Sequence, residues 1–153
     1  MKPTAITLIL VVGAGAVGCG GKKTETEGRP EPAGPYVTKF RIGRAVAPDR
    51  KVTIETDSFA QGDPIHISFE VKKAPPKSQA KVVWSDSSKR KISEEQKEIP
   101  SGTGAVSFEL KDAKDLAIGD YLVEFFCGDS GEALAKWSGV GHKPFRVGPK
   151  RTS

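Results

Sequence analysis

The side chains of this chain that could act as bases, nucleophiles or metal ligands include two histidines and two cysteines. A hydrolase that uses a catalytic triad needs a base, usually histidine, within hydrogen-bond reach of its nucleophile. His66 alternates with the apolar residues of its segment, and His142 lies in a glycine-rich stretch; neither is accompanied by a Gly-x-Ser-x-Gly motif. The sequence therefore predicts no catalytic residues and a protein that is not an enzyme.

The cysteines and acidic residues also offer little for metal chemistry. A reactive thiol needs an exposed, electropositive setting, whereas Cys127 shares the inward parity of its segment and is predicted to be a small buried hydrophobe. The close-spaced ligand sets of structural zinc and the Asp-x-Asp-x-Asp run of calcium loops are both missing. Asp57, Asp63 and Asp120 stand near turns and are predicted to form them, so no metal site is expected.

Two surface features are candidates for binding. Lys89, Arg90 and Lys91 follow a polar stretch that predicts a loop or hairpin, where they can either contact an anionic partner or discourage unwanted strand pairing. Leu122 and Phe126 lie on the nominal outer face of their segment. With Trp137 they mark a possible protein contact, or else Trp137 and its loop cover them.

The segments that must position these residues alternate between apolar and polar side chains, which is typical of half-buried strands. The clearest alternation runs from Ile65 to Lys72. Further inward rows are Val82 with Trp84, Val106 to Leu110, Tyr121 to Cys127, and Phe145 with Val147; Phe40 with Ile42 and Val52 with Ile54 suggest one or two opening strands. Ser93 to Ile99 is read as a short helix, a strand edge or a single turn. We expect one all-β domain over residues 36–148, an antiparallel β-sandwich of about seven strands.

The N-terminus has the build of an export signal, with Lys2, an apolar run from Ala5 to Val17, and small residues before Cys19. A run of this length is too short for a membrane-spanning helix, which needs about 20 apolar residues. We therefore expect residues 1–18 to be a cleaved signal peptide.

The segment Ala16-Val17-Gly18-Cys19 resembles the lipobox of bacterial lipoproteins, although the family prefers a bulky aliphatic residue where Ala16 stands. The resemblance implies cleavage before Cys19, which then carries a diacylglycerol and an N-acyl chain; no other cofactor is expected. An ordinary secretory signal is the alternative. Gly20 after the cysteine implies sorting to the outer membrane, facing the periplasm, if the cell is Gram-negative.

Residues 19–35 are rich in glycine and proline and contain no large apolar residue, so we expect a flexible linker behind the lipidated cysteine. Residues 149–153 are polar and predicted to be a disordered tail. Without Lys2 the chain has 23 basic and 19 acidic residues, a net charge of +4. This excess is small, and with export it argues against nucleic acid as a partner.

Three short motifs resemble the immunoglobulin-like domains of exported bacterial proteins: the Phe59-x-x-Gly62-Asp63 turn, Trp84, and Gly119-Asp120-Tyr121 at the start of the penultimate strand. The resemblance implies that Trp84 packs in the core and that the Tyr121 hydroxyl bonds to nearby backbone. The domain lacks the cysteine pair of antibody domains.

Taken together, these features predict a non-catalytic lipoprotein, anchored to the envelope by its lipid, whose sandwich binds or positions another envelope component. A permanent accessory subunit of a larger envelope complex is the alternative. No small-molecule substrate is evident from the sequence.

Overall fold

The computed structural model describes residues 33–129 and 141–151, apart from the side chain of residue 129. In this part the chain forms eight strands and one short 3-10 helix. In chain order these elements are β1 (Tyr36–Gly43), β2 (Ser58–Ala60), β3 (His66–Ala74), β4 (Ser78–Asp86), β5 (Lys91–Glu98), β6 (Gly102–Glu109), η1 (Ala113–Asp115), β7 (Gly119–Asp129) and β8 (Gly141–Gly148).

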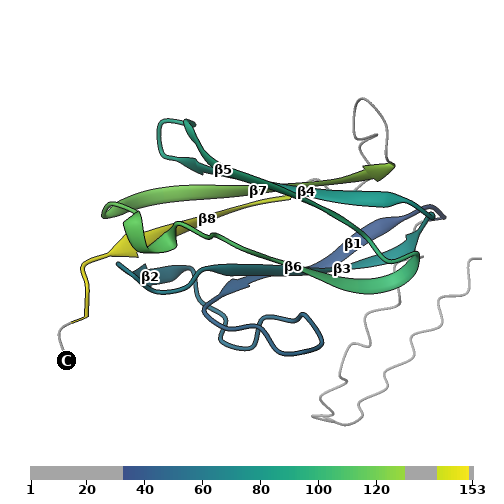
Figure 1. Ribbon diagram of the computed structural model, residues 1–153, viewed down its shortest axis with the longest axis horizontal. Helices are drawn as coiled ribbons and strands as arrows, with labels where there is room; N and C mark the ends of the chain where they lie inside the picture. Colours follow the sequence, from purple (N-terminus) through teal and green to yellow (C-terminus); the bar gives the residue numbers. More distant parts are fainter. Residues whose placement is uncertain (1–32, 130–140, 152–153) are drawn as a thin grey trace, which may run out of the picture. The chain divides into compact units, whose positions relative to one another are not determined.

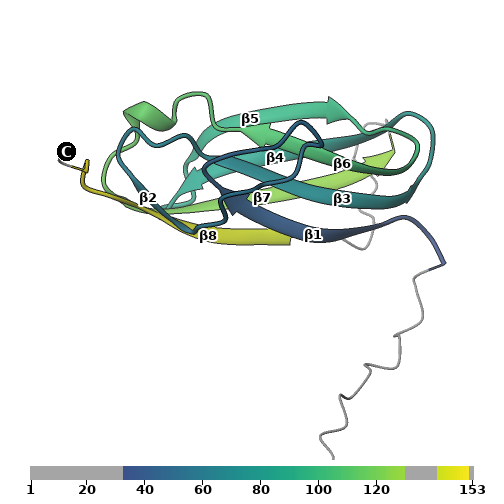
Figure 2. The same cartoon turned by 90° about the horizontal axis from the view of Figure 1, so that it is seen from below.

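The strands form two sheets that pack face to face (Figure 1). The three-stranded sheet has the order β1-β3-β6, and the five-stranded sheet has the order β2-β8-β7-β4-β5. Neighbouring strands are antiparallel except for the short β2, which runs parallel to β8. Figure 2 shows the three-stranded sheet in front of the other. The predicted β-sandwich is confirmed.

The strand order is that of an immunoglobulin-like sandwich. In that fold the first, second and fifth strands share one sheet, while the third, sixth and seventh share the other. Here β1, β3 and β6 make up the first group and β4, β7 and β8 the second. β5 lengthens the second sheet beside β4, as the extra strands of variable-type domains do.

The predicted inward rows of β3, β4, β7 and β8 fill the space between the sheets. Phe69 of one sheet stacks on Phe125 of the other with ring centroids 4.9 Å apart. Trp84 is 1% exposed and meets the ring of Phe145 edge-on at 5.8 Å. Period-two alternation therefore identified the core correctly, and Trp84 lies within it.

Two details of β7 follow the immunoglobulin pattern only in part. The Tyr121 hydroxyl donates a hydrogen bond of 2.7 Å to the carbonyl oxygen of Ala117, as the resemblance implied. In antibody domains a cysteine stands two residues after this tyrosine, but here the position is the fully buried Val123. Cys127 lies further along the strand, opposite Ala80, and is also buried.

Two segments differ from a simple strand pattern. Val52 and Ile54 form no strand of their own: Val52 makes one isolated bridge with Val46, and Ile54 is 55% exposed. Of the one or two opening strands expected from these residues, β1 forms and the second does not, since the segment turns back before it can pair at length. Ser93 to Ile99 falls almost wholly in the edge strand β5, so the strand alternative is the correct one.

The signal peptide, Cys19, all but the end of the linker, and Trp137 lie outside the described residues. At the other end, the Arg151 guanidinium lies 3.6 Å from the Asp63 carboxylate. Within residues 33–129 and 141–151, no helix is long and apolar enough to cross a membrane.

Candidate functional site

A β-bulge in β1 shapes the outer face of the three-stranded sheet. The pairing of β1 with β3 jumps between Thr38 and Arg41, so that Lys39 and Phe40 together face a single residue of β3. Lys39 has φ = 54°, a left-handed conformation that costs an L-residue about 1 kcal/mol. The extra residue turns Phe40 inward, where its ring lies 4.5 Å from that of Phe125. Lys39 and Arg41 consequently both lie on the outer face.

The segment between β1 and β2 folds over this same face (Figure 1). It packs closely against Gly43, where an added Cβ would overlap the carbonyl oxygen of Ile54 and the side chain of Val52. The backbone N–H of Val52 donates a 2.9 Å hydrogen bond to Ser68 Oγ, and Val52 is 3% exposed. Because Val52 is held on the sheet, the preceding Lys51 is held above β3.

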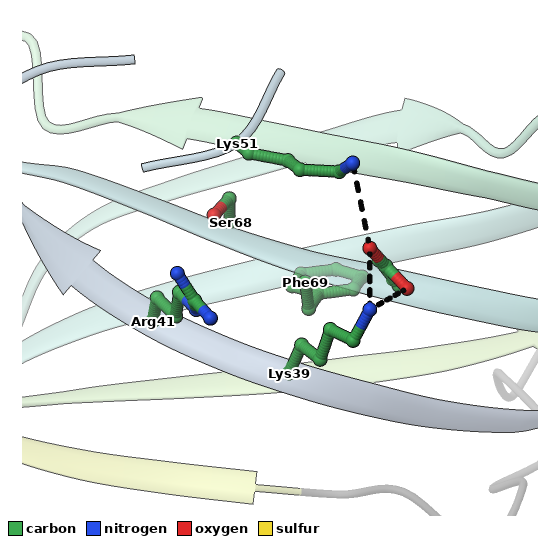
Figure 3. A pocket seen from close by; sticks show the side chains of 6 residues that line it. Lys39, Arg41, Lys51, Ser68 and Phe69 are labelled. Atoms are coloured by element: carbon green, nitrogen blue, oxygen red, sulfur yellow. Dashed lines mark hydrogen bonds and ion pairs between the residues drawn. The ribbon is translucent and has the colours of Figure 1, made fainter. Parts of the chain in front are cut away.

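Glu70 lies among the lysines on this face. Lys39 Nζ is 3.1 Å from its carboxylate and Lys51 Nζ is 3.8 Å from it (Figure 3). Lys72 Nζ also lies 3.8 Å from this carboxylate. The hydrogen bond from Lys39 and the charges of the three lysines lower the pKa of Glu70 below its usual value, although burial opposes this. Lys51 also pairs with Asp49 at 3.2 Å, and this contact lowers the pKa of Asp49.

These residues line two adjoining pockets that share Lys39, Lys51 and Glu70. The first, of about 250 Å³, lies between β1 and β3 and reaches Arg41 (Figure 3). The second, of about 390 Å³, extends across the sheet to β6. We call the two together the cationic groove; its charged members are Lys39, Arg41, Asp49, Lys51, Glu70 and Lys72.

The basic cluster predicted from the sequence lies elsewhere, in the hairpin between β4 and β5. Arg90 pairs with Asp86 at 2.8 Å, and Lys91 pairs with Glu94 at 3.0 Å. The backbone N–H of Arg90 is the main cause of the lowered pKa of Asp86, and the Arg90 side chain adds to it. Lys89 has φ = 60° and closes the turn. Two of the three cations thus already have carboxylate partners.

The candidate protein contact lies on the outer face of the five-stranded sheet. Leu122 and Phe126 are both half-buried, and Lys81 Nζ lies 5.9 Å from the centre of the Phe126 ring. Neither side chain is fully exposed, and Trp137 is outside the described residues. The protein contact at Leu122 and Phe126 therefore stays a prediction.

The groups considered for catalysis lie far apart in the fold. His66 pairs across the three-stranded sheet with Glu109, while His142 pairs with Glu124 of the five-stranded sheet. By strand parity each histidine faces outward, so the two lie on opposite faces of the sandwich. Burial raises the pKa of the Cys127 thiol to about 12.

Two of the acidic residues considered for calcium have partners in the fold. Asp63 Oδ2 accepts a hydrogen bond from the Ala60 backbone N–H at 2.9 Å, next to Gly62 with φ = 93°. Asp120 lies 3.5 Å from Arg146. Within residues 33–129 and 141–151, no group of three or more histidine, cysteine or acidic side chains is placed to hold a metal ion.

Sequence reasoning missed the cationic groove. Its cations come from β1, from the following segment and from β3, and at each place they read as ordinary surface lysines. The usable signal is Glu70, a single acidic residue on the outer face of a strand whose next outward residue is Lys72. That signal gains meaning only when the pairing of β1 with β3 is known.

No protein-family model matches the chain, and no curated protein matches it. Among solved structures, the C-terminal domain of wzt is similar at 13% identity with a TM-score of 0.53, over 80% of this chain and 81% of that one. A β-glucosidase from Listeria innocua in complex with isofagomine is 18% identical with a TM-score of 0.41. That match covers 73% of this chain but only 16% of the enzyme. The first of these likenesses supports the β-sandwich fold and nothing further.

Proposed function

We propose that this chain is an exported bacterial lipoprotein, anchored to the envelope through lipid on Cys19, whose sandwich is a non-catalytic module that binds another envelope component. The observation that carries the binding role is the cationic groove. It is recessed, its charged residues come from three separate segments, and four cations there face only two carboxylates. A surface kept soluble by scattered lysines needs no such recess.

The distribution of chemical groups supports the non-catalytic part of the proposal. A general base must lie within hydrogen-bond reach of the group it activates. His66 and His142 lie on opposite faces, and Cys127 is buried with a raised pKa. The nucleophiles and bases weighed from the sequence thus do not come together.

The anchor and its location rest on the lipobox resemblance. Replacing Cys19 by alanine is expected to abolish acylation and to move the protein from the membrane fraction to the soluble envelope fraction. Mass spectrometry of the intact protein and fractionation of cells measure both effects. Unchanged mass and unchanged membrane partition in Cys19→Ala would contradict the anchor.

The binding role is tested by photo-crosslinking in intact cells. A photoreactive residue at Thr103, which lines the groove, is expected to give a discrete crosslinked product. The same residue at Lys111, exposed and outside the groove, serves as the control. Equal yields at the two positions would remove the support for the groove as the binding surface.

The alternative, a permanent accessory subunit, is favoured by one feature: the half-buried apolar residues Val83, Leu122 and Phe126 share the outer face of the five-stranded sheet. A photoreactive residue at Leu122 tests it in the same cells. Crosslinking there, together with elution as a large stable assembly after detergent extraction, would favour the accessory role over the binding module.

A further inference from the structure

We propose that the cationic groove binds a phosphate monoester group. This assignment rests on the proposed binding function and names its ligand class. The groove has four cationic and two acidic side chains, an excess of two positive charges. A phosphate monoester carries about −1.5 to −2 charges at pH 7, which matches that excess. A phosphodiester or carboxylate carries a single charge and leaves part of it uncompensated.

The lysines around Glu70 keep hydrogen-bonding capacity for such a ligand. Glu70 contacts three ammonium groups, two of them at 3.8 Å, and Lys51 also pairs with Asp49 at 3.2 Å. The side chains of Lys39 and Lys51 are 60% and 52% exposed. An ammonium group has three donors, so each lysine can contact Glu70 and still donate to one of the three terminal phosphate oxygens.

Arg41 adds a cation with little internal compensation. Its Nε lies 3.9 Å from Glu55, at the limit of an ion pair, and its side chain is 48% exposed. Glu55 is also 3.8 Å from Lys143. Arg41 and Lys39 both line the first pocket, and Figure 3 shows Arg41 to the left of Phe69 and Lys39 below it. The guanidinium fork suits the planar pairs of oxygens that phosphate presents.

The shape of the groove suits the rest of such a ligand. The second pocket is lined on β6 by the small residues Thr103, Gly104 and Ala105, so no long side chain enters it from that strand. A phosphate held in the first pocket leaves about 390 Å³ beside it for the group that carries the ester. The other basic cluster differs in charge, because Arg90 and Lys91 each have a carboxylate partner within 3.0 Å.

Glu70 competes with the phosphate for the lysine ammonium groups. The isolated full chain is placed in phosphatidylcholine nanodiscs, and phenyl phosphate and phenyl sulfate are titrated in at neutral pH. Phenyl phosphate is expected to bind at least about tenfold more tightly, because only its second charge distinguishes the two electrostatically. Backbone amide shifts should gather on β1, β3 and residues 49–52. Equal affinities, or shifts spread over all lysines, would overturn the proposal.

Variants that remove either a positive or a negative charge from the groove provide the second test. Lys39→Gln and Lys51→Gln are expected to weaken phenyl phosphate binding about fivefold or more, whereas Glu70→Gln should strengthen it by a similar factor. Lys111→Gln and Glu124→Gln make the same charge changes away from the groove and should alter affinity less than about twofold. If Glu70→Gln behaves like Glu124→Gln, the groove is not the site. Near-UV circular dichroism checks that every variant remains folded.

Two sources of phosphate are separated by adding phosphatidic acid, a lipid phosphate monoester, to the nanodiscs. Groove shifts that appear with this lipid and are reversed by phenyl phosphate identify a lipid headgroup; their absence beside phenyl phosphate binding identifies a non-lipid phosphate ester. If Thr103 crosslinks a partner in cells while phenyl phosphate does not bind, the binding function stands and the phosphate assignment fails. If phenyl phosphate binds in the groove but Thr103 gives no crosslink in cells, the phosphate assignment stands and the binding of an envelope partner at the groove fails.

Discussion

At the scale of single residues, Cys127 illustrates how burial in the fold makes a thiol unreactive. The thiol points between the sheets, 2% exposed, and burial raises its pKa to about 12. The thiolate, which is the reactive form, is therefore scarce at neutral pH. The residue acts as a small apolar side chain next to Ala80 on the neighbouring strand.

We expect the Cys127 thiol to resist iodoacetamide in the native protein and to react once the chain is unfolded. The Cys19→Ala variant isolates this one thiol, since the chain has two cysteines. Cys127→Ser should lower the free energy of unfolding by about 1–3 kcal/mol, because it buries a hydroxyl without a ready partner. Cys127→Ala keeps the site apolar and should cost less. Rapid labelling of the native thiol would contradict its burial.

At the scale of elements, the contact between residues 44–57 and the three-stranded sheet creates the groove. This contact requires a glycine at position 43, because any Cβ there meets the backbone of Ile54. The Val52 hydrogen bond to Ser68 then fixes the segment, and Lys51 with it. The glycine is required by close approach, since its φ angle is not in the left-handed region.

Gly43→Ala is therefore expected to push the segment off the sheet and to cost about 1–3 kcal/mol of stability. Chemical denaturation measures the loss, and phenyl phosphate binding should weaken as Lys51 moves away. Gly34→Ala is the matched control, because an added Cβ at that position meets nothing within 4 Å. Equal stability of the two variants would show that the segment is not held by this contact.

The turn before β7 is held by the side chain of Tyr121. Its hydroxyl bonds to Ala117, while its ring stacks on Phe145 with centroids 5.4 Å apart. Tyr121→Phe keeps the ring and removes the hydrogen bond, so the unfolding free energy should fall by about 1 kcal/mol. Tyr121→Leu also loses the ring stacking and should cost more. A Phe variant as stable as the parent would mean that the bond contributes nothing net.

At the scale of the whole molecule, acidic side chains with lowered pKa values occur on both sheets. Asp49 and Glu70 belong to the groove, whereas Asp86 and Glu94 belong to β4, β5 and their hairpin. A carboxyl whose pKa is lower in the folded state stabilises the fold above its unfolded value. That contribution disappears as the pH falls through the folded value.

We therefore expect the urea midpoint to be nearly constant from neutral pH down to about 5 and to fall below about 4.5, the ordinary value for glutamate. Glu70→Gln and Asp86→Asn should each flatten part of that decline, because each removes one such carboxyl. Urea unfolding followed by circular dichroism at several pH values measures the effect. A midpoint that rises on acidification would contradict the assigned sign.

The strand alternation was enough to predict the sandwich, the inward rows and the buried positions of Trp84 and Cys127. Period two is a local property, since successive side chains of a strand point to opposite faces whatever the strand pairs with. The Tyr121 corner was likewise readable from its motif. β5 was ambiguous because edge strands are charged on both faces, which removes the alternation.

What the sequence by itself determined is the fold class and the residues of its core, because burial leaves a periodic mark on each strand. Only the tertiary structure decided which polar side chains meet. The bulge at Lys39, the docking of Val52 on the outer face and the lysines around Glu70 depend on pairings between distant segments. A lysine in the left-handed backbone conformation and a carboxylate shared by several lysines give no periodic pattern in the sequence. The groove could therefore be identified only from the pairing of the strands.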